Sequence, residues 1–410
     1  MKLPLRVASC LLLAAAPLLA QNEAPIKIGF LAPQSGITAS SGKDMIDGFK
    51  LYFEERGNQI GGREVKLLFR DDKGSPSDAL TALDQFVKED KVDLLAGGLL
   101  ANVGYALAPL LDKYRIPMLY PVMSGDDLTQ RTPFHWVVRT GWNSSQPTHP
   151  FGEWVFQHLG HKKVATFAMD YPFGYEQVGG FQKSFEDAGG EVVQKIWAPL
   201  GAASYASYIA QIRKDVDAVF VVTVGVAIAK FPAEYRAAGF KLPLLGGGPT
   251  FDETFLPAMG ETALGGYSAM FYSAAIDSPA NRRFVKKFRE KYSRVPTYYA
   301  ESSYTTGMWI EKAVLDLKGN VANKDLLLDA LKAVELKDAP RGPIRLDSRG
   351  NPVQNIYIRK VEHKNGGYHN TVVETFPNVS QFWKYDPAEF LKQPVYGRDF
   401  PPCVHCKTGP

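Results

Sequence analysis

Short apolar segments alternate with amphipathic ones along most of the chain. The residues IKIGFL from Ile26 are typical of a buried strand, and the stretch GKDMIDGFKLYFEERG from Gly42 carries apolar side chains on one face of a helix. The same order recurs with VKLLFRDD and a helical pattern after Ser75, and again with VDLLAGG and a helix predicted over 102–114. Strands that alternate with helices predict a parallel sheet covered by helices on both faces.

A second series of the same kind starts after residue 146. Its strands are predicted at KVATFAMD, EVVQKIWA, DAVFVVTV and PLLGGG, with helical patterns at 174–187, 205–213 and 227–238. Two such series in one chain predict two α/β lobes. Helices are expected at about 279–292 and 298–317, and antiparallel-looking segments follow them. The simplest arrangement uses these late elements to complete the two lobes and their sheets, so several connections between the lobes are expected.

The first twenty residues have the pattern of a secretory signal peptide. Lys2 and Arg6 precede a short apolar run, and cleavage is predicted after Ala20. This run is shorter than the roughly 20 residues that a membrane span needs, and no later segment is apolar enough to serve as one. We therefore expect an exported protein that is not anchored in the membrane.

The charge of the chain gives no reason to expect nucleic acid or an anionic membrane surface as a partner. The formal net charge of +4 falls to +2 when Lys2 and Arg6 are set aside, because residues 1–20 carry no acid. The hydrophobic fraction of 45% is sufficient to fill sizeable cores.

Two cysteines of the mature chain lie in PPCVHCK near the C-terminus. In an oxidising compartment, Cys403 and Cys406 are most simply a short-loop disulfide, while a free pair, a redox site and half of a metal site stay open as alternatives. Haem attachment is not expected, because Lys407 stands where that motif requires histidine. We expect this tail to lie apart from the ligand cleft.

The sequence offers little for catalysis, cofactors or metals. It has no phosphate-binding Gly-x4-Gly-Lys-Ser/Thr loop, no GxGxxG after a strand and no GxSxG. His158 and His161 are interpreted as surface histidines at a helix end rather than metal ligands. Asp126 and Asp127 are interpreted as capping charge before a helical turn rather than as a catalytic pair. An enzyme would need a nucleophile, a metal set or paired acids in the cleft.

The loops that follow the strands are expected to form one cleft between the lobes, since open α/β sheets bind ligands beyond the carboxyl ends of their strands. The loop GGLLANVG, at 97–104, joins a strand end to a helix N-terminus, whose free N–H groups and partial positive charge suit an anion. Trp142, Tyr171, Phe173 and Phe251 lie in such loops, where aromatic side chains usually cover a surface.

Several segments together resemble the type I periplasmic binding proteins. The likeness is carried by GKDMIDGFKLYFEE, DDKGSPSDALTALDQFV and DYPFGYEQVGGFQKSFEDAGGEVV, and it runs from about Pro25 to Lys384. More narrowly, the chain resembles the branched-chain amino acid receptor group, the solute-binding subunits of ATP-driven (ABC) importers. The resemblance implies an α/β fold with two Rossmann-like lobes, joined by three crossings that act as a hinge. The lobes are predicted as 25–141 with 272–345 and 142–271 with 346–385, followed by a tail at 386–410.

The resemblance also suggests which ligand groups the cleft can hold. Amino acid binders of this group hold the ligand carboxylate with a serine, which is replaced here by Ala101 beside Asn102, and with a threonine-like position occupied by Ser124. The acid expected to hold the ligand amine is replaced by Gly248, and an aromatic hydroxyl by Phe173. A buried ammonium without its carboxylate would cost several kcal/mol. We therefore expect a carboxylate without an α-amine, of the benzoate or phenylpropanoid type.

The predicted ligand-binding residues come from the strand-end loops and the helix starts that follow them. They are Ser41, Leu100, Ala101, Asn102, Val122, Met123, Ser124, Trp142, Tyr171, Phe173, Thr223, Gly248 and Phe251. The predicted partners are this small carboxylate and the membrane permease of an importer, and the protein is expected to be a monomer without a cofactor. An amino acid, amide or urea-type ligand, and a role as a ligand-sensing receptor subunit, remain as alternatives.

Overall fold

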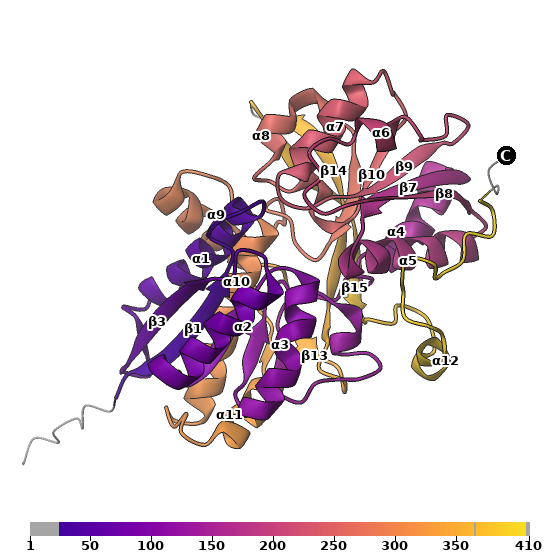
Figure 1. Ribbon diagram of the computed structural model, residues 1–410. Helices are drawn as coiled ribbons and strands as arrows, with labels where there is room; N and C mark the ends of the chain where they lie inside the picture. Colours follow the sequence, from indigo (N-terminus) through magenta and orange to yellow (C-terminus); the bar gives the residue numbers. More distant parts are fainter. Residues whose placement is uncertain (1–23, 365, 407–410) are drawn as a thin grey trace, which may run out of the picture.

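The computed structural model describes residues 24–364 and 366–406, which form two α/β lobes side by side (Figure 1). The predicted signal peptide lies outside the described residues. Each lobe has a central sheet with helices packed against it, so the predicted fold class is confirmed. Among the described residues, none of the helices combines the length and the apolar character needed to cross a membrane.

The first lobe has a six-stranded sheet in the order β2-β3-β1-β4-β5-β6, which is parallel except for β2. Its strands are β1 (Ile26–Ala32), β2 (Gln59–Ile60), β3 (Arg63–Asp71), β4 (Leu94–Gly97), β5 (Met118–Tyr120) and β6 (Val137–Arg139). Its helical elements are α1 (Ala39–Glu54), α2 (Pro76–Gln85), η1 (Phe86–Asp90), α3 (Ala101–Tyr114), η2 (Asp126–Leu128), α9 (Pro279–Tyr292), α10 (Tyr298–Asp316) and α11 (Lys324–Lys332).

The elements of this lobe form where the pattern predicts them. Ser75 caps α2 by accepting from the Asp78 N–H, and Pro76 occupies the first helical position. Helix α1 packs against α10 at Gly48, where a Cβ atom would lie 2.0 Å from the Ala300 carbonyl oxygen, so only glycine permits this approach. The later helices thus return the chain to the first lobe.

The second lobe has a nine-stranded sheet in the order β12-β13-β14-β11-β10-β9-β7-β8, with β15 paired to β14. Its strands are β7 (Lys163–Met169), β8 (Glu191–Ala198), β9 (Ala218–Val222), β10 (Leu244–Gly246), β11 (Tyr267–Met270), β12 (Glu335–Leu336), β13 (Ile344–Leu346), β14 (Pro352–Lys364) and β15 (Gly367–Val379). Its helical elements are α4 (Thr148–Trp154), η3 (Val155–Leu159), α5 (Pro172–Asp187), α6 (Ala206–Ile209), α7 (Ala227–Ala237), η4 (Gly248–Phe251), α8 (Leu256–Met259) and η5 (Gly260–Thr262).

The described chain crosses between the sheets three times, after β6, after β11 and after α11. Strands β12 and β13 pair within the second sheet. The chain therefore enters the second sheet at β12, before residue 345, where the lobe boundary is predicted. The lobe boundaries themselves stay a prediction.

The two lobes are in contact across the mouth of the cleft. The Val226 N–H donates to the Ile37 carbonyl oxygen at 3.2 Å, and the Thr254 hydroxyl donates to the Asp44 carboxylate at 2.8 Å. Because both hydrogen bonds join one lobe to the other, this conformation is closed.

The C-terminal tail, with α12 (Pro387–Lys392), packs against α5 of the second lobe. Tyr396 lies over Gly179, where a Cβ atom would meet the phenol ring at 2.5 Å, and its hydroxyl is 3.0 Å from Nε2 of the buried His149. Cys403 and Cys406 are joined by a disulfide bond. Arg398 pairs with Asp170, the residue before Tyr171, so the tail reaches closer to the predicted cleft than the sequence suggested.

Candidate functional site

A pocket lies between the lobes at the strand ends where the ligand was predicted. The residues that line it are Leu99, Leu100, Ala101, Val122, Ser124, Trp142, Tyr171, Phe173, Val224, Pro249, Tyr298 and Tyr299. They come from loops of both sheets, as expected for a site that closes when the lobes come together. The side chains leave a free volume of only about 10 Å³, the size of one water molecule. A ligand with a ring can therefore enter only when the lobes or the lining side chains move apart.

Two helix N-termini, one from each lobe, begin at this pocket. Helix α3 starts at Ala101 after Leu100, and α5 starts at Pro172 after Tyr171. Among the described residues, no side chain caps either helix. The N–H groups of each first turn, other than that of Pro172, therefore lack an intrahelical partner and carry partial positive charge. Such an arrangement suits an anionic group of a ligand.

Polar side chains add to these backbone donors. The Ser144 hydroxyl lies 3.0 Å from both Ser124 Oγ and the Ser124 carbonyl oxygen, and the Ser124 hydroxyl lines the pocket, where it can donate to a ligand. Thr223 Oγ1 and Asn102 Oδ1, both adjacent in sequence to lining residues, are buried without a hydrogen-bond partner among the described residues. Buried polar atoms are normally satisfied, so the Thr223 hydroxyl favours a polar ligand group, whereas Asn102 Oδ1 can only accept a hydrogen bond.

Aromatic side chains form much of the pocket wall. The Trp142 indole donates to the Val122 carbonyl oxygen at 3.2 Å, and its ring centroid lies 5.7 Å from that of Phe173 and 6.0 Å from that of Tyr298. A Cβ atom on Gly248 would lie 2.8 Å from Trp142 Cη2. The indole thus occupies the space that an acidic side chain at position 248 would need.

The residues that line the pocket are uncharged. Burial is the main cause that raises the pKa values of Tyr171 and Tyr298 well above the ordinary phenol value, and the pKa of Tyr299 is raised for the same reason. These phenols therefore stay protonated at neutral pH and can donate hydrogen bonds. The lining therefore presents N–H and O–H donors to an anion, and the carboxyl groups of Asp252 and Asp44, which act on Tyr299, are not among the residues that line the pocket.

Some predicted residues do not line the pocket. Ser41 on α1 lies beside the Tyr299 hydroxyl, and the Met123 side chain packs against Gly98 and Gly104. The Phe251 ring packs against Gly246 and Gly266 in the core of the second lobe.

Some residues that line the pocket were not predicted from the sequence. Tyr298 and Tyr299 begin α10, far along the chain from the first-lobe loops. The sequence signal that could have identified them is the pair of aromatic residues directly after the N-cap Thr297. A helix that returns to the first lobe can begin at the cleft, so residues at its N-terminus can line the pocket.

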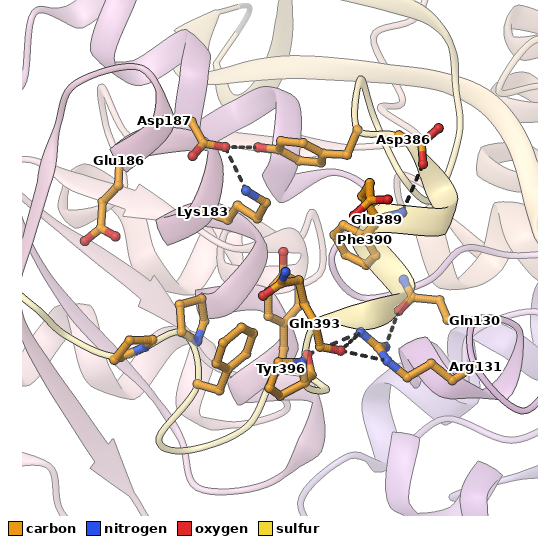
Figure 2. A pocket seen from close by; sticks show the side chains of 15 residues that line it. Gln130, Arg131, Lys183, Glu186, Asp187, Asp386, Glu389, Phe390, Gln393 and Tyr396 are labelled. Atoms are coloured by element: carbon orange, nitrogen blue, oxygen red, sulfur yellow. Dashed lines mark hydrogen bonds and ion pairs between the residues drawn. The ribbon is translucent and has the colours of Figure 1, made fainter.

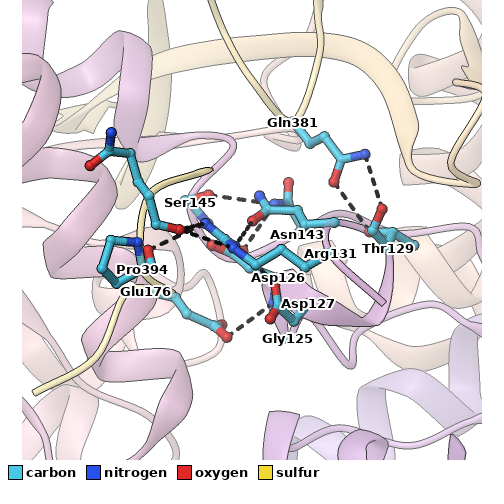
Figure 3. Close-up of polar contacts among 12 residues, drawn as sticks. Gly125, Asp126, Asp127, Thr129, Arg131, Asn143, Ser145, Glu176, Gln381 and Pro394 are labelled. Carbon is cyan, nitrogen blue, oxygen red and sulfur yellow. Dashed lines mark hydrogen bonds and ion pairs between the residues drawn. The ribbon is translucent and has the colours of Figure 1, made fainter. Parts of the chain in front are cut away.

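Asp126 and Asp127 begin the short helical turn η2, as a capping interpretation expects, but Asp126 is buried. Its carboxylate accepts from Asn143 Nδ2 at 2.9 Å and from the Ser145 N–H at 3.1 Å (Figure 3). Glu176 of α5 approaches the same turn and accepts from the Asp126 N–H at 3.0 Å. Asp126 therefore belongs to a polar cluster at the junction of the lobes.

A second, larger pocket of about 370 Å³ lies between the tail and α5 (Figure 2). Phe390 and Tyr396 of the tail form part of its apolar wall, and Lys183 and Asp187 of α5 pair with each other across 3.0 Å at its edge. Among the described residues, no group of three His, Cys, Asp or Glu side chains is placed to hold a metal ion here or elsewhere.

Comparisons with known proteins agree with this geometry. A family model described as "Periplasmic binding protein" matches residues 25–367. The Leu/Ile/Val-binding protein homolog 6 of Brucella melitensis is 30% identical over 364 residues, which cover 86% of this chain and 91% of that protein.

Solved structures similar to this chain include two solute-binding proteins of ABC transporters from Rhodopseudomonas palustris. The one from strain BisB5, in complex with 3,4-dihydroxybenzoic acid, is 30% identical with a TM-score of 0.83 and covers 87% of this chain and 98% of that chain. The one from strain HaA2, in complex with p-hydroxybenzoic acid, is 28% identical with a TM-score of 0.82 and covers 88% of this chain and 99% of that chain.

Proposed function

Because this chain belongs to the periplasmic binding protein family, we propose that it captures a small aromatic carboxylate between its lobes for the permease of an ABC importer. One observation carries the proposal. Two uncapped helix N-termini meet at a pocket that has aromatic walls and no charged residue among those that line it. A carboxylate on an aromatic ring matches both the donors and the walls.

The two ends of the ligand have different roles in this proposal. The carboxylate accepts hydrogen bonds from the first turn of α3 and from the Ser124 hydroxyl. The ring packs against Trp142 and Phe173, and its burial contributes roughly 1.5–3 kcal/mol. The structural relatives that hold hydroxybenzoic acids support this ligand class.

A second candidate is an amino acid, amide or urea-type ligand. The name of the Leu/Ile/Val-binding relatives favours it. The geometry around Gly248 speaks against a zwitterion, since the Trp142 ring fills the place of the acid that would neutralise an ammonium group. A sensing role would use the same binding chemistry with another membrane partner.

The setting of this function is also proposed. We expect the signal peptide to be removed after Ala20 and the mature protein to act as a monomer in the periplasm. Membership of the family supports this setting.

A thermal-shift screen followed by calorimetry tests the ligand class. Benzoate and 4-hydroxybenzoate should raise the unfolding temperature, since a ligand at a hundredfold excess over its Kd stabilises the folded state by about 2.7 kcal/mol. Leucine and valine serve as the matched aliphatic controls. Tight binding of leucine together with failure of every aromatic acid would contradict the proposal.

A further inference from the structure

A hydrogen-bonded cluster joins the two lobes one helical turn behind the ligand pocket. The Tyr105 hydroxyl of α3 donates to Glu176 Oε1 of α5 at 2.9 Å, and the same oxygen accepts from the Asp126 N–H at 3.0 Å. Figure 3 shows Glu176 approaching the 125–127 turn. Tyr105 and Asp126 belong to the first lobe and Glu176 to the second, so these contacts join the two lobes in the closed conformation.

The cluster is built on the two helices whose N-termini face the pocket. Tyr105 lies one turn after Ala101 on α3, and Glu176 lies one turn after Phe173 on α5. A change in the lobe angle that admits a ligand between the helix starts must also alter the distance between Tyr105 and Glu176. The state of the cluster is therefore coupled to ligand capture.

The formal charges around Glu176 do not sum to zero when both buried carboxyl groups are ionised. Arg139 of β6 is the buried cation, and its guanidinium donates to the carbonyl oxygens of Trp142 and Gly125 rather than to a carboxylate. Asp127 of η2 is paired with Arg131 at 2.9 Å. The other titratable groups that face this cluster are phenols, which stay neutral: Tyr105 of α3, Tyr120 of β5, Tyr171 before α5 and Tyr396 of the tail. One buried cation thus faces two buried carboxyl groups, Asp126 and Glu176.

A single proton would neutralise this cluster. Asp126 Oδ2 and Glu176 Oε2 are buried without a hydrogen-bond partner among the described residues, so a negative charge on either oxygen would be poorly stabilised. Asp126, Glu176 and Arg139 are all buried, so two ionised carboxylates beside one guanidinium would be costly here.

We propose that closing the lobes around the ligand takes up one proton from solvent, which is held on a carboxyl oxygen of the Glu176–Asp126 pair. When the lobes open, Glu176 separates from its first-lobe partners, reaches water and releases the proton, while Asp126 remains beside Arg139. Burial is the largest cause that raises the pKa of Glu176 well above its ordinary value and the pKa of Asp126 to about 6. This inference rests on the proposed function only for the identity of the ligand.

The consequence is that ligand affinity depends on pH. The carboxyl pKa is higher in the closed state than in the open state, so a fall in pH between these two values favours closure. The apparent Kd should then fall by up to tenfold per pH unit, and it should level off below the pKa of the open state.

Calorimetry with benzoate in two buffers tests the proton uptake. Benzoate is fully ionised at pH 7 and has no other titrating group, so a difference in binding heat between phosphate and Tris reports protons exchanged by the protein. We expect about one proton taken up per benzoate bound by the natural protein and none by Glu176→Gln, which keeps the shape of the side chain. Glu191→Gln, at the start of β8 in the same lobe, should behave like the natural protein.

The outcomes separate this inference from the proposed function. Benzoate binding to the natural protein without proton uptake would overturn the proton-linked closure and leave the ligand class intact. If benzoate and the other aromatic acids fail to bind, small-angle scattering of the ligand-free protein between pH 8 and pH 6 decides. The radius of gyration should decrease with falling pH in the natural protein but not in Glu176→Gln, and an unchanged radius in both would overturn the inference.

Discussion

The pocket between the lobes and the pocket between the tail and α5 differ in volume and in whether their polar groups already have partners. The tail pocket offers about 370 Å³ and the interlobe pocket about 10 Å³. Yet the cations of the tail pocket are engaged, Lys183 with Asp187 and Arg131 with Asp127 and the Gln393 carbonyl oxygen. The interlobe pocket has the smaller volume, but the N-termini of α3 and α5 begin at it without a side-chain cap among the described residues, so backbone N–H donors face it.

Removing one ring from each pocket should give the largest difference between them. Phe173→Ala takes away a wall of the interlobe pocket and should weaken aromatic acid binding by roughly 1.5–3 kcal/mol. Phe390→Ala removes the same kind of ring from the tail cluster with Phe382 and Tyr396, and the ligand affinity should stay unchanged. Calorimetry with 4-hydroxybenzoate measures both variants. Equal losses of affinity would mean that the two pockets are not independent.

A fall in pH should destabilise the folded state through His149, which packs against the tail, whereas the same fall in pH should favour closure at the lobe junction. Burial lowers the pKa of His149 to about 3, so the folded state keeps this ring neutral while the unfolded state is protonated below about pH 6.5. The contribution of the neutral His149 ring to the free energy of unfolding is complete above pH 6.5 and is lost as the pH falls. At pH 5 it should cost about 2 kcal/mol of the free energy of unfolding.

Denaturant unfolding of the natural protein and of His149→Asn at pH 7 and pH 5 checks this pH dependence. The variant should lack this part of the acid sensitivity. The same sensitivity in both proteins would assign it to other groups.

The Ser124 hydroxyl should have a smaller effect than the Phe173 ring. Ser124→Ala removes one donor to the ligand carboxylate and should weaken aromatic acids by about 0.5–1.5 kcal/mol, or by up to about 3 if the bond to the charged group is strong. Ser207→Ala, on α6 of the second lobe and outside both pockets, is the matched control. An unchanged Kd for Ser124→Ala would place the carboxylate elsewhere in the cleft.

Reduction of the tail disulfide should have the smallest effect on ligand binding. Cys403 and Cys406 are separated by three positions, and the Cys403 Sγ contacts the Val192 carbonyl oxygen on β8, away from the interlobe pocket. Affinity measured with and without reductant should agree to within about 0.5 kcal/mol, the scatter of a remote change. A larger loss would show that the contact between Arg398 and Asp170 transmits the state of the tail to Tyr171.

The sequence predicts the parts of this protein that depend on local pattern. The two lobes follow from the alternation of strands and helices, and the loops of the cleft follow from the rule that ligands lie beyond the carboxyl ends of parallel strands. Within these loops, Ala101 and Ser124 were singled out by the resemblance to amino acid binders of the family. Tyr298 and Tyr299 were not predicted, because they reach the pocket only through the crossing that returns α10 to the first lobe.

Other features depend on packing that no local pattern reveals. Loop position suggested that Phe251 faces the cleft, but Gly246 and Gly266 leave space for its ring in the core instead. The tail lies beyond the matched residues 25–367, and no local pattern shows that Tyr396 fits over Gly179 or that Arg398 pairs with Asp170.

A crystal structure of the protein with bound 4-hydroxybenzoate would show which of the two pockets holds the ligand. We expect the ligand between the lobes, with its carboxylate about 3 Å from the first N–H groups of α3 and from Ser124 Oγ, and with its ring against Trp142 and Phe173. Density for the ligand in the tail pocket alone, or a carboxylate turned away from the helix N-termini, would contradict this expectation.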